Sequence, residues 1–170
     1  MIIAFWICLF LIVYTFLGYG IILFILVKLK RVWKGKQTIE YDLDQLPSCT
    51  LIVAAYNEAD FIAEKIKNTL ALNYPPGLLQ FIFVTDGSVD QTPEIISQYP
   101  EIKLMHRSER KGKIVAVHRA MQEVNTEVVV FTDANTFLNP DALINICRHY
   151  ADPKTGAVAG EKRVKIDETS

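Results

Sequence analysis

Residues 49–55, CTLIVAA, form a short apolar run that ends at the polar triplet Tyr56-Asn57-Glu58. A continuous apolar run of this length is typical of a strand that is buried on both faces of a parallel sheet. Residues 79–85 (LQFIFVT), 102–106 and 127–132 have the same character. The sequence therefore predicts a sheet with four strands at these positions.

Helices are predicted between these strands. Residues 59–72 carry apolar side chains at helical spacing, among them Phe61, Ile66 and Leu70, and the following Tyr-Pro-Pro-Gly ends the helix. Residues 91–99, 113–124 and 140–150 are the other predicted helices, and residues 157–164 are a further candidate strand. Alternating strands and helices with short connections predict an α/β fold, a mainly parallel sheet covered by helices on both faces.

The first 27 residues contain no charged side chain. About 20 apolar residues suffice to cross a bilayer as a helix, and residues 2–27 exceed that length. A cleaved signal peptide is the alternative, but this start has no basic segment, its apolar run is too long, and no small-residue cleavage site follows it. We therefore expect residues 1–27 to form a transmembrane helix.

A basic segment follows the apolar run, before the first acid at Glu40. Its cations are Lys28, Lys30, Arg31, Lys34 and Lys36. The positive-inside rule keeps such a segment on the cytoplasmic side, where it could also bind anionic lipid head groups. Residues 28–48 are thus expected to be a juxtamembrane segment and linker. Residues 49–170 are expected to form a domain on the cytoplasmic face of the inner membrane.

Acidic side chains dominate the rest of the chain. Of 18 Lys and Arg, five precede residue 37, which leaves 13 against 19 Asp and Glu. A general nucleic-acid binder needs a basic face, so no nucleic-acid partner is expected. Cys8, Cys49 and Cys147 are far apart in the sequence and predict neither a CxxC metal pair nor a disulfide framework.

Polar side chains gather where three predicted strands end. They are Tyr56-Asn57-Glu58, Asp86-Gly87-Ser88 and Asp133-Ala134-Asn135. A single Asp at a strand end is more often a turn former or helix cap than a ligand. Ligands of parallel α/β sheets, however, bind outside the carboxyl ends of the strands. Three such groups at one edge therefore favour a binding site.

Within these groups, Gly87 lets the backbone pass close to a ligand, and Asp86 can accept hydrogen bonds from a base or a sugar. Asp90 and Thr92 are better explained as caps of the next helix. Residues 107–113, RSERKGK, precede a helix N-terminus, where backbone N–H groups favour phosphate. There is no P-loop and no GxGxxG pattern.

Asp133 and Asn135 place two oxygen-bearing side chains two residues apart. Mg²⁺ typically binds one or two protein oxygens together with phosphate oxygens. A metal ion held here could neutralise the diphosphate of a nucleotide substrate, although the triplet alone is a weak signal.

Taken in order, these segments resemble the family 2 glycosyltransferases of the GT-A fold, the membrane-bound processive members in particular. LIVAAYNEADFI (residues 51–62) is similar to the opening strand and Tyr-Asn-Glu turn of that family, and FIFVTDGSVDQT (81–92) to its Asp-Asp-Gly-Ser segment. RKGKIVAVHRA (110–120) resembles its Gly-Lys helix start, and VVVFTDANTFL (128–138) its DXD motif. The resemblance covers roughly residues 49–160.

The resemblance implies sugar transfer from a nucleotide-diphosphate donor, with a UDP-sugar expected, to a hydroxyl of a saccharide or lipid acceptor. It also implies Mg²⁺ or Mn²⁺ as cofactor and a role in cell-surface polysaccharide or glycolipid synthesis. The resemblance also implies the site residues. Tyr56, Asn57, Glu58, Asp86 and Gly87 would line the nucleotide pocket, with Asp86 at the base, and Lys113 would lie near the nucleotide. Asp133 would contact the ribose or the metal ion, and Asn135 would bind the metal ion.

The chain departs from the family pattern at four positions. Ala54 stands where Pro is common and Thr85 where Asp is common. His118 stands where Asn is common, and Asn135 where a second Asp is common. Asn135 removes one charge from the metal site but keeps an oxygen ligand, and His118 is expected to be a helix-face residue. The family's general base comes from a later acidic segment, so the base is expected beyond Ser170.

No Gln-x-x-Arg-Trp motif of the processive members is present either. An N-terminal fragment of a longer enzyme, inactive alone, is therefore expected. The alternative is a non-catalytic, membrane-anchored nucleotide-binding module or an inactive remnant.

Overall fold

The computed structural model describes residues 1–34 and 45–161. The chain divides into two compact units, Met1–Glu40 and Tyr41–Ser170. We call them the helical unit and the α/β unit and describe each by itself.

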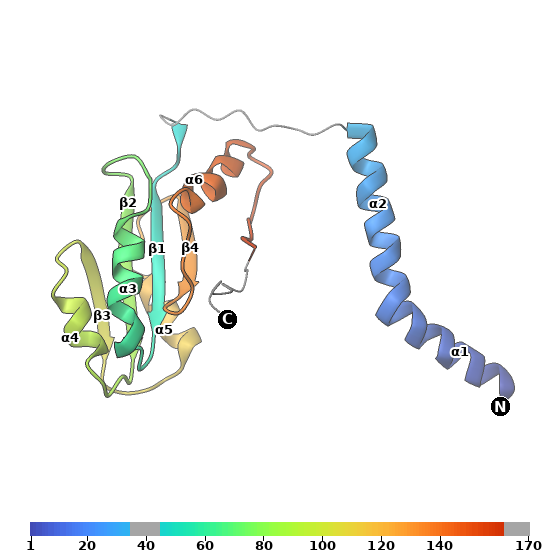
Figure 1. Cartoon of the computed structure of the whole chain (residues 1–170), viewed down its shortest axis with the longest axis horizontal. Helices are drawn as coiled ribbons and strands as arrows, with labels where there is room; N and C mark the ends of the chain where they lie inside the picture. The colour runs from blue at the N-terminus through green and yellow to red at the C-terminus, as the bar shows by residue number, and fades with distance from the viewer. Residues whose placement is uncertain (35–44, 162–170) are drawn as a thin grey trace, which may run out of the picture. The chain divides into compact units, whose positions relative to one another are not determined.

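The helical unit is an unbroken helix that consists of α1 (Ile2–Val13), the π-helical turn η1 (Tyr14–Gly18) and α2 (Tyr19–Lys34) (Figure 1). Its 32 residues Ile2–Trp33 are long and apolar enough to cross a membrane, by length and composition. At about 1.5 Å per residue they span about 48 Å, which exceeds the hydrocarbon thickness of about 30 Å. The predicted helix is therefore present, and it continues past residue 27 into the basic segment.

The α/β unit is built on a four-stranded parallel sheet with the strand order β3-β2-β1-β4. Its strands are β1 (Cys49–Ala55), β2 (Leu79–Asp86), β3 (Ile102–Arg107) and β4 (Val128–Asp133). The register aligns Ala54 of β1 with Val84 on one side and with Asp133 on the other. The polar residues that follow β1, β2 and β4 therefore meet at one edge, and the predicted α/β fold class is confirmed.

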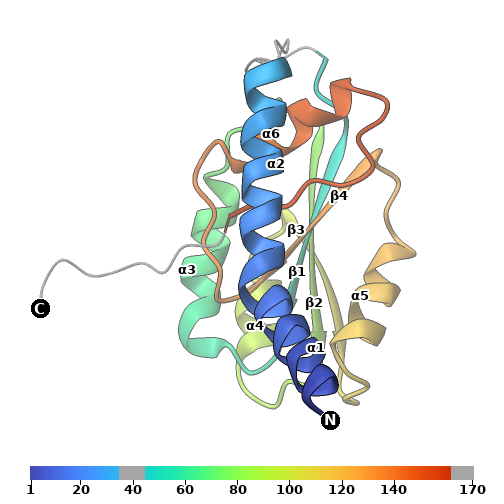
Figure 2. The ribbon, with the colours of Figure 1, turned by 90° about the vertical axis from the view of Figure 1, so that its right-hand side faces the viewer.

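Helices cover both faces of the sheet (Figure 2). They are α3 (Ala59–Leu70), α4 (Thr92–Ser97), α5 (Lys113–Met121) and α6 (Ala142–Cys147), followed by the 3-10 turn η3 (Arg148–Ala151). On one face, Leu51 and Phe83 form a buried core with Ile62, Ile96 and Leu143 of α3, α4 and α6. On the other face, β1 and β2 side chains pack against Ala116 and Ala120 of α5. Successive strand residues point to opposite faces, so a strand buried on both faces reads as a continuous apolar run.

The structure differs from the prediction on the inner face of α3. The buried residues of this helix are Ile62, Lys65, Ile66 and Thr69, whereas Phe61 and Leu70 are 53% and 37% exposed. Residues 157–161 do not form the candidate strand, and residues 162–164 lie outside the described part of the chain. The other predicted strands and helices are present with bounds that shift by a few residues.

The chain enters the sheet through residues that are held at the amino ends of the strands. Leu46 is buried in a cluster with Cys49, Val128 and Cys147. The next residue, Pro47, is also held, because its carbonyl accepts a hydrogen bond of 2.6 Å from the Tyr74 hydroxyl. The last residues of the predicted linker thus pack as part of the α/β unit.

Candidate functional site

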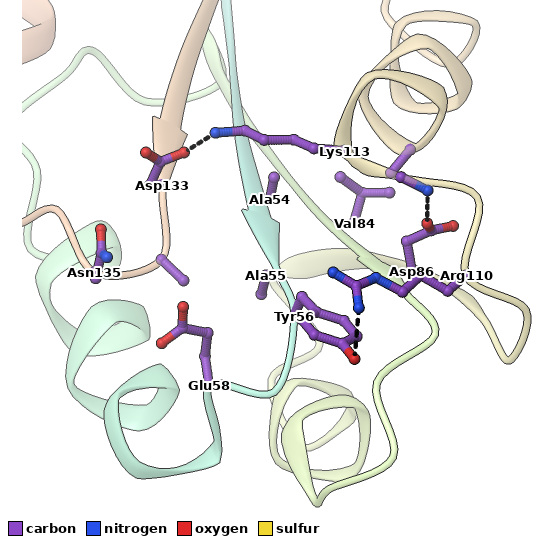
Figure 3. A pocket seen from close by; sticks show the side chains of 13 residues that line it. Ala54, Ala55, Tyr56, Glu58, Val84, Asp86, Arg110, Lys113, Asp133 and Asn135 are labelled. Carbon is purple, nitrogen blue, oxygen red and sulfur yellow. Dashed lines mark hydrogen bonds and ion pairs between the residues drawn. The ribbon is translucent and has the colours of Figure 1, made fainter.

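A pocket of about 280 Å³ lies at the carboxyl ends of β1, β2 and β4 (Figure 3). Its lining includes six of the residues predicted for the site: Tyr56, Glu58, Asp86, Lys113, Asp133 and Asn135. Small or apolar residues, Ala54, Ala55, Val84, Ala116 and Ala134, form much of the remaining wall. The sheet topology therefore brings together polar groups that are up to 79 residues apart in the sequence.

The pocket has two ends of different chemistry. In Figure 3, Asp86, Arg110 and Tyr56 lie on one side, and Asp133, Asn135 and Glu58 lie on the other. Lys113 extends between them above Ala54. We call these the aromatic end and the oxygen-rich end. A ligand that spans the pocket would meet a flat aromatic ring, then a cation, and then two or three oxygen ligands.

Asp86 is fixed by the loop that precedes α5. Its side chain is almost buried, at 6% exposure, and Oδ2 accepts hydrogen bonds from the backbone N–H groups of Lys111 and Gly112, each 2.6 Å long. Hydrogen bonds to a charged acceptor are stronger than neutral ones, so this pair holds the carboxylate in one place. These two N–H groups were expected to favour phosphate, but they serve the Asp86 carboxylate instead.

Asn57 and Gly87 are not among the lining residues; they shape the turns beside the pocket. Asn57 has a left-handed φ of 52°, and its Oδ1 accepts a hydrogen bond from the N–H of Val89 at 3.0 Å. Gly87 has a φ of 72°, and a Cβ placed on it would lie 2.5 Å from Cβ of Arg110. The loop that carries Arg110 can therefore approach β2 closely only because residue 87 has no side chain.

Tyr56 and Arg110 form one wall at the aromatic end. The guanidinium carbon of Arg110 lies 4.0 Å from the centre of the Tyr56 ring, and Nη1 donates to the Tyr56 hydroxyl at 3.1 Å. A cation over a ring face is attracted to it electrostatically. Arg110 was not predicted individually. Its place in the basic segment 107–113 was the signal that could have identified it.

Asp133 lies between two lysines at the oxygen-rich end. The ammonium group of Lys113, the first residue of α5, forms an ion pair with Asp133 Oδ1. From the other side, the fully buried Lys65 of α3 donates to the carbonyl of Thr136 and, at 3.4 Å, to Oγ1 of Thr132. Burial lowers the pKa of Lys65 to about 8, while the charge of Asp133 acts in the opposite direction. At neutral pH Lys65 is therefore still a cation.

The oxygen-rich end is suited to a hard divalent cation with few protein ligands. No three His, Cys, Asp or Glu side chains come together as a metal site within residues 1–34 and 45–161. The side chains that could serve are a carboxylate, Asp133, and an amide, Asn135. Mg²⁺ and its relatives accept such a set when phosphate oxygens and water complete the coordination.

Asp90 contacts the start of the predicted helix α4, and Asp90 and Thr92 both also contact the start of α3, which was not predicted. Asp90 Oδ2 accepts from the N–H of Ala59, and Thr92 Oγ1 accepts from the N–H of Glu58, so both hold the start of α3. Asp90 Oδ1 also accepts from the N–H of Thr92 at the start of α4. Burial alone would raise the pKa of Asp90, but these hydrogen bonds hold it below its usual range. The turn after β2 is thereby tied to the turn after β1.

Two departures from the family pattern fall away from the pocket. Thr85 is fully buried, and its Oγ1 shares a hydrogen bond of 2.8 Å with Nδ1 of His106. His118 is exposed on α5, in agreement with its prediction as a helix-face residue. Sequence reasoning also missed Lys65, because its partners Thr132 and Thr136 come from a distant part of the sequence.

Comparisons with known proteins match this chain to synthases of poly-β-1,6-N-acetyl-D-glucosamine. The chain is 32% identical over 130 residues to the poly-β-1,6-N-acetyl-D-glucosamine synthase of Staphylococcus aureus strain MSSA476. The match covers 74% of this chain and 31% of that synthase. A synthase of the same name from Staphylococcus epidermidis is 28% identical over 131 residues, which are 75% of this chain and 31% of that protein. The chain thus spans about a third of the length of these relatives.

Solved structures support the same fold. The mannosyltransferase PcManGT from Pyrobaculum calidifontis, in complex with GDP-Man and Mn²⁺, matches with a TM-score of 0.73 and 33% identity over 89% of this chain and 46% of that one. S. aureus TarS, in complex with UDP-GlcNAc, matches with a TM-score of 0.54 and 24% identity over 58% of this chain and 29% of that one. The second likeness supports the fold alone.

The family model described as "Glycosyl transferase family 2" matches residues 50–170. This range contains the sheet except for Cys49, the whole pocket and all four motifs quoted from the sequence. The chain therefore belongs to glycosyl transferase family 2.

Proposed function

We propose that this chain is the donor-binding part of a membrane-anchored glycosyltransferase that moves a sugar from a nucleotide-diphosphate sugar to an acceptor hydroxyl. The product would be a cell-surface polysaccharide or a glycolipid. Support comes from family membership, from the polysaccharide synthases that it resembles, and from the GDP-Man and Mn²⁺ bound to the related mannosyltransferase. The general base and the acceptor site are assigned to no residue of this chain.

The observation that carries the proposal is the order of groups across the pocket. The aromatic end offers the Tyr56 ring and the Asp86 carboxylate, which suit a nucleoside base that has N–H donors. Lys113 follows at the centre, where a diphosphate would need a cation. Asp133 and Asn135 then offer oxygen ligands for a metal ion on the diphosphate. The base, the diphosphate and a metal ion bound to the diphosphate would thus meet matching groups in that order.

Asp133 and Asn135 are the residues that would hold Mg²⁺ or Mn²⁺. The bound cation would offset the negative charge that develops on the departing nucleoside diphosphate. The chain's own residues would orient the donor, and the ion pair with Lys113 would hold the Asp133 carboxylate in place for the metal ion. Because the Lys113 ammonium is on a flexible four-carbon stem, it can turn from Asp133 to a phosphate when the donor binds.

Calorimetric titration of the full chain in detergent tests this function. UDP and GDP are titrated separately, each with and without Mn²⁺, into the wild type and the Asp133→Ala variant. We expect saturable, Mn²⁺-dependent binding of one nucleotide by the wild type and its loss in Asp133→Ala. Glu123→Ala is the matched control, since Glu123 is an exposed carboxylate that pairs with Lys103 on the surface. Equal binding by Asp133→Ala and wild type would contradict the assigned role.

A gain-of-charge variant sharpens this test. Asn135→Asp restores a second carboxylate at the oxygen-rich end and is expected to lower the Mn²⁺ concentration required for half-maximal nucleotide binding. If neither nucleotide binds the wild type at all, the chain is the inactive remnant named as the alternative. Binding without any transfer in the full-length enzyme would identify a non-catalytic nucleotide-binding module.

We further propose that Ile2–Trp33 anchors the chain in the inner membrane with the α/β unit in the cytoplasm. The support is the length and composition of this helix and the cations Lys28, Lys30 and Arg31 in its last turns. Protease treatment of inverted inner-membrane vesicles is expected to digest the α/β unit, and treatment of intact spheroplasts is expected to leave it whole. The reverse pattern would refute this orientation.

A further inference from the structure

Lys65 is a buried ammonium group that the proposed function does not use. It is located on the inner face of α3, with Ile62, Ile66 and Thr69 as its buried helical neighbours, and its exposure is 0%. Burying an ammonium group costs far more than burying a methionine side chain of similar length, unless polar partners compensate. The partners of Lys65 therefore indicate what this residue does.

Those partners belong to the segment that carries the proposed metal ligands. Lys65 Nζ donates to the carbonyl of Thr136, one residue after Asn135, and to Oγ1 of Thr132, one residue before Asp133. The ammonium group thus bridges the two sides of the turn that presents Asp133 and Asn135. Burial lowers its pKa to about 8, which still leaves the group protonated at neutral pH.

A second side chain of α3 holds the same segment one turn later. Asn68 Nδ2 donates to the carbonyl of Leu138 at 2.7 Å, and Asn68 Oδ1 accepts from the N–H of Leu138 at 2.9 Å. Lys65 and Asn68 are three residues apart and therefore lie on one side of the helix. Together they attach residues 132–138 to α3 by four hydrogen bonds.

We propose that Lys65 is a positioning residue, which with Asn68 holds residues 132–138 in the shape that directs Asp133 and Asn135 into the pocket. This inference rests on the proposed function for its ligand, but the fixed turn is a property of the chain itself. A purely structural lysine would contribute to the stability of the unit and would have no specific effect on this turn. A positioning lysine loosens the turn when it is replaced, while the rest of the unit keeps its stability.

The variant Lys65→Met tests the difference, because methionine keeps the length and the packing of the side chain but removes the charge and the donors. The matched control is Lys67→Met, which changes an exposed lysine of the same helix. The first readout is hydrogen exchange of the full chain in detergent, followed by mass spectrometry of the peptide that contains residues 132–138. We expect exchange to be faster by about tenfold or more in Lys65→Met and unchanged in Lys67→Met.

The second readout is the Mn²⁺ concentration that gives half-maximal binding of UDP or GDP. In Lys65→Met it is expected to rise by about tenfold, which corresponds to about 1.4 kcal/mol, while the urea midpoint of the unit stays close to that of the wild type. Unchanged exchange of residues 132–138 would overturn the inference. Unchanged Mn²⁺ dependence in a variant that binds nucleotide would also overturn it.

Two further results keep the inference separate from the proposed function. If the wild type binds no nucleotide, the proposed function fails, and the exchange experiment still decides whether Lys65 holds the turn. If Lys65→Met does not fold, Asn68→Ala replaces it, because this variant removes only the two hydrogen bonds to Leu138. Wild-type exchange of residues 132–138 in Asn68→Ala would then refute the inference, and faster exchange confined to that peptide would support it.

Discussion

Replacing Gly87 by alanine is expected to destabilise the α/β unit by about 2–5 kcal/mol, in two steps that add. A non-glycine residue at the left-handed φ of 72° costs about 1–2 kcal/mol. The new Cβ would then lie 2.5 Å from Cβ and 2.9 Å from Cα and N of Arg110. Backbone atoms cannot rotate away, and overpacking of this kind costs about 1–3 kcal/mol.

The matched control is Gly77→Ala. Gly77 has a similar φ of 81°, but an added Cβ there would have no atom within 4 Å. Only the conformational cost of about 1–2 kcal/mol applies. The difference between the two variants therefore isolates the close approach of Arg110 to residue 87.

Urea unfolding of the full chain in detergent, followed by circular dichroism, measures both variants. Tryptophan fluorescence is unsuitable because Trp6 and Trp33, the two tryptophans of the sequence, both lie in the helical unit. Gly87→Ala should lower the free energy of unfolding by at least about 1 kcal/mol more than Gly77→Ala. Equal losses in the two variants would refute the packing account.

Three further predictions concern side-chain interactions. Asp90→Ala should cost about 1–2 kcal/mol at pH 7, because Asp90 accepts N–H groups at the starts of two helices. Because the pKa of Asp90 is lower in the folded state, its stabilisation is fully present at pH values above the usual Asp pKa of about 3.9. The difference in unfolding free energy between wild type and Asp90→Ala should therefore shrink as the pH falls below that value. For Lys65, whose pKa is about 8 when folded and 10.5 when free, only the unfolded state holds the proton between these values. The free energy of unfolding of the wild type relative to Lys65→Met, measured in urea, should therefore rise with pH in that window by up to about 1.4 kcal/mol per pH unit. Lys103→Ala should cost less than about 1 kcal/mol, because its ion pair with Glu123 is half exposed on both sides.

Each of these three predictions has an outcome that contradicts it. For Asp90, it is a loss of unfolding free energy in Asp90→Ala that stays constant from pH 7 down to pH 3. For Lys65, it is a stability difference from Lys65→Met that is the same at pH 7.5 and pH 9.5. For Lys103, it is a loss as large as that of Asp90→Ala.

The sequence predicted the central strands β1 and β2 well because they are largely buried on both faces, which gives a continuous apolar run that does not depend on their partners. The edge strands β3 and β4 are only partly buried, and they were predicted from β-forming residues and from the alternation with helices. The helix α3 was harder, since its buried face includes Lys65 and Thr69. The apolar spacing correctly selected Ile66, which is buried, but it also selected Phe61 and Leu70, which are exposed. Lys65 is buried because acceptors arrive from the turn after β4, and no property of residues 59–70 alone contains that information.

The candidate site shows a similar division. Six of the residues that line the pocket were predicted from strand ends and motifs, because a parallel sheet brings its carboxyl ends to one edge. What each residue contacts depends on the loops. Asp86 binds the backbone before α5, and Asn57 binds the turn after β2, so neither contact follows from strand positions. The family predicted from the four motifs is confirmed by the match over residues 50–170.

The strand order also determines when the sheet can be completed during synthesis. β1 pairs with β2 thirty residues later, but its other neighbour, β4, follows only 79 residues after β1, as the pairs Cys49–Leu79 and Cys49–Val128 show. At roughly 5–20 residues per second, a ribosome needs about 4–16 s to deliver β4. Through that interval the most apolar strand of the nascent chain has an open edge, which invites pairing with other chains. Insertions between β2 and β4 would lengthen this exposure, whereas insertions after β4 would not.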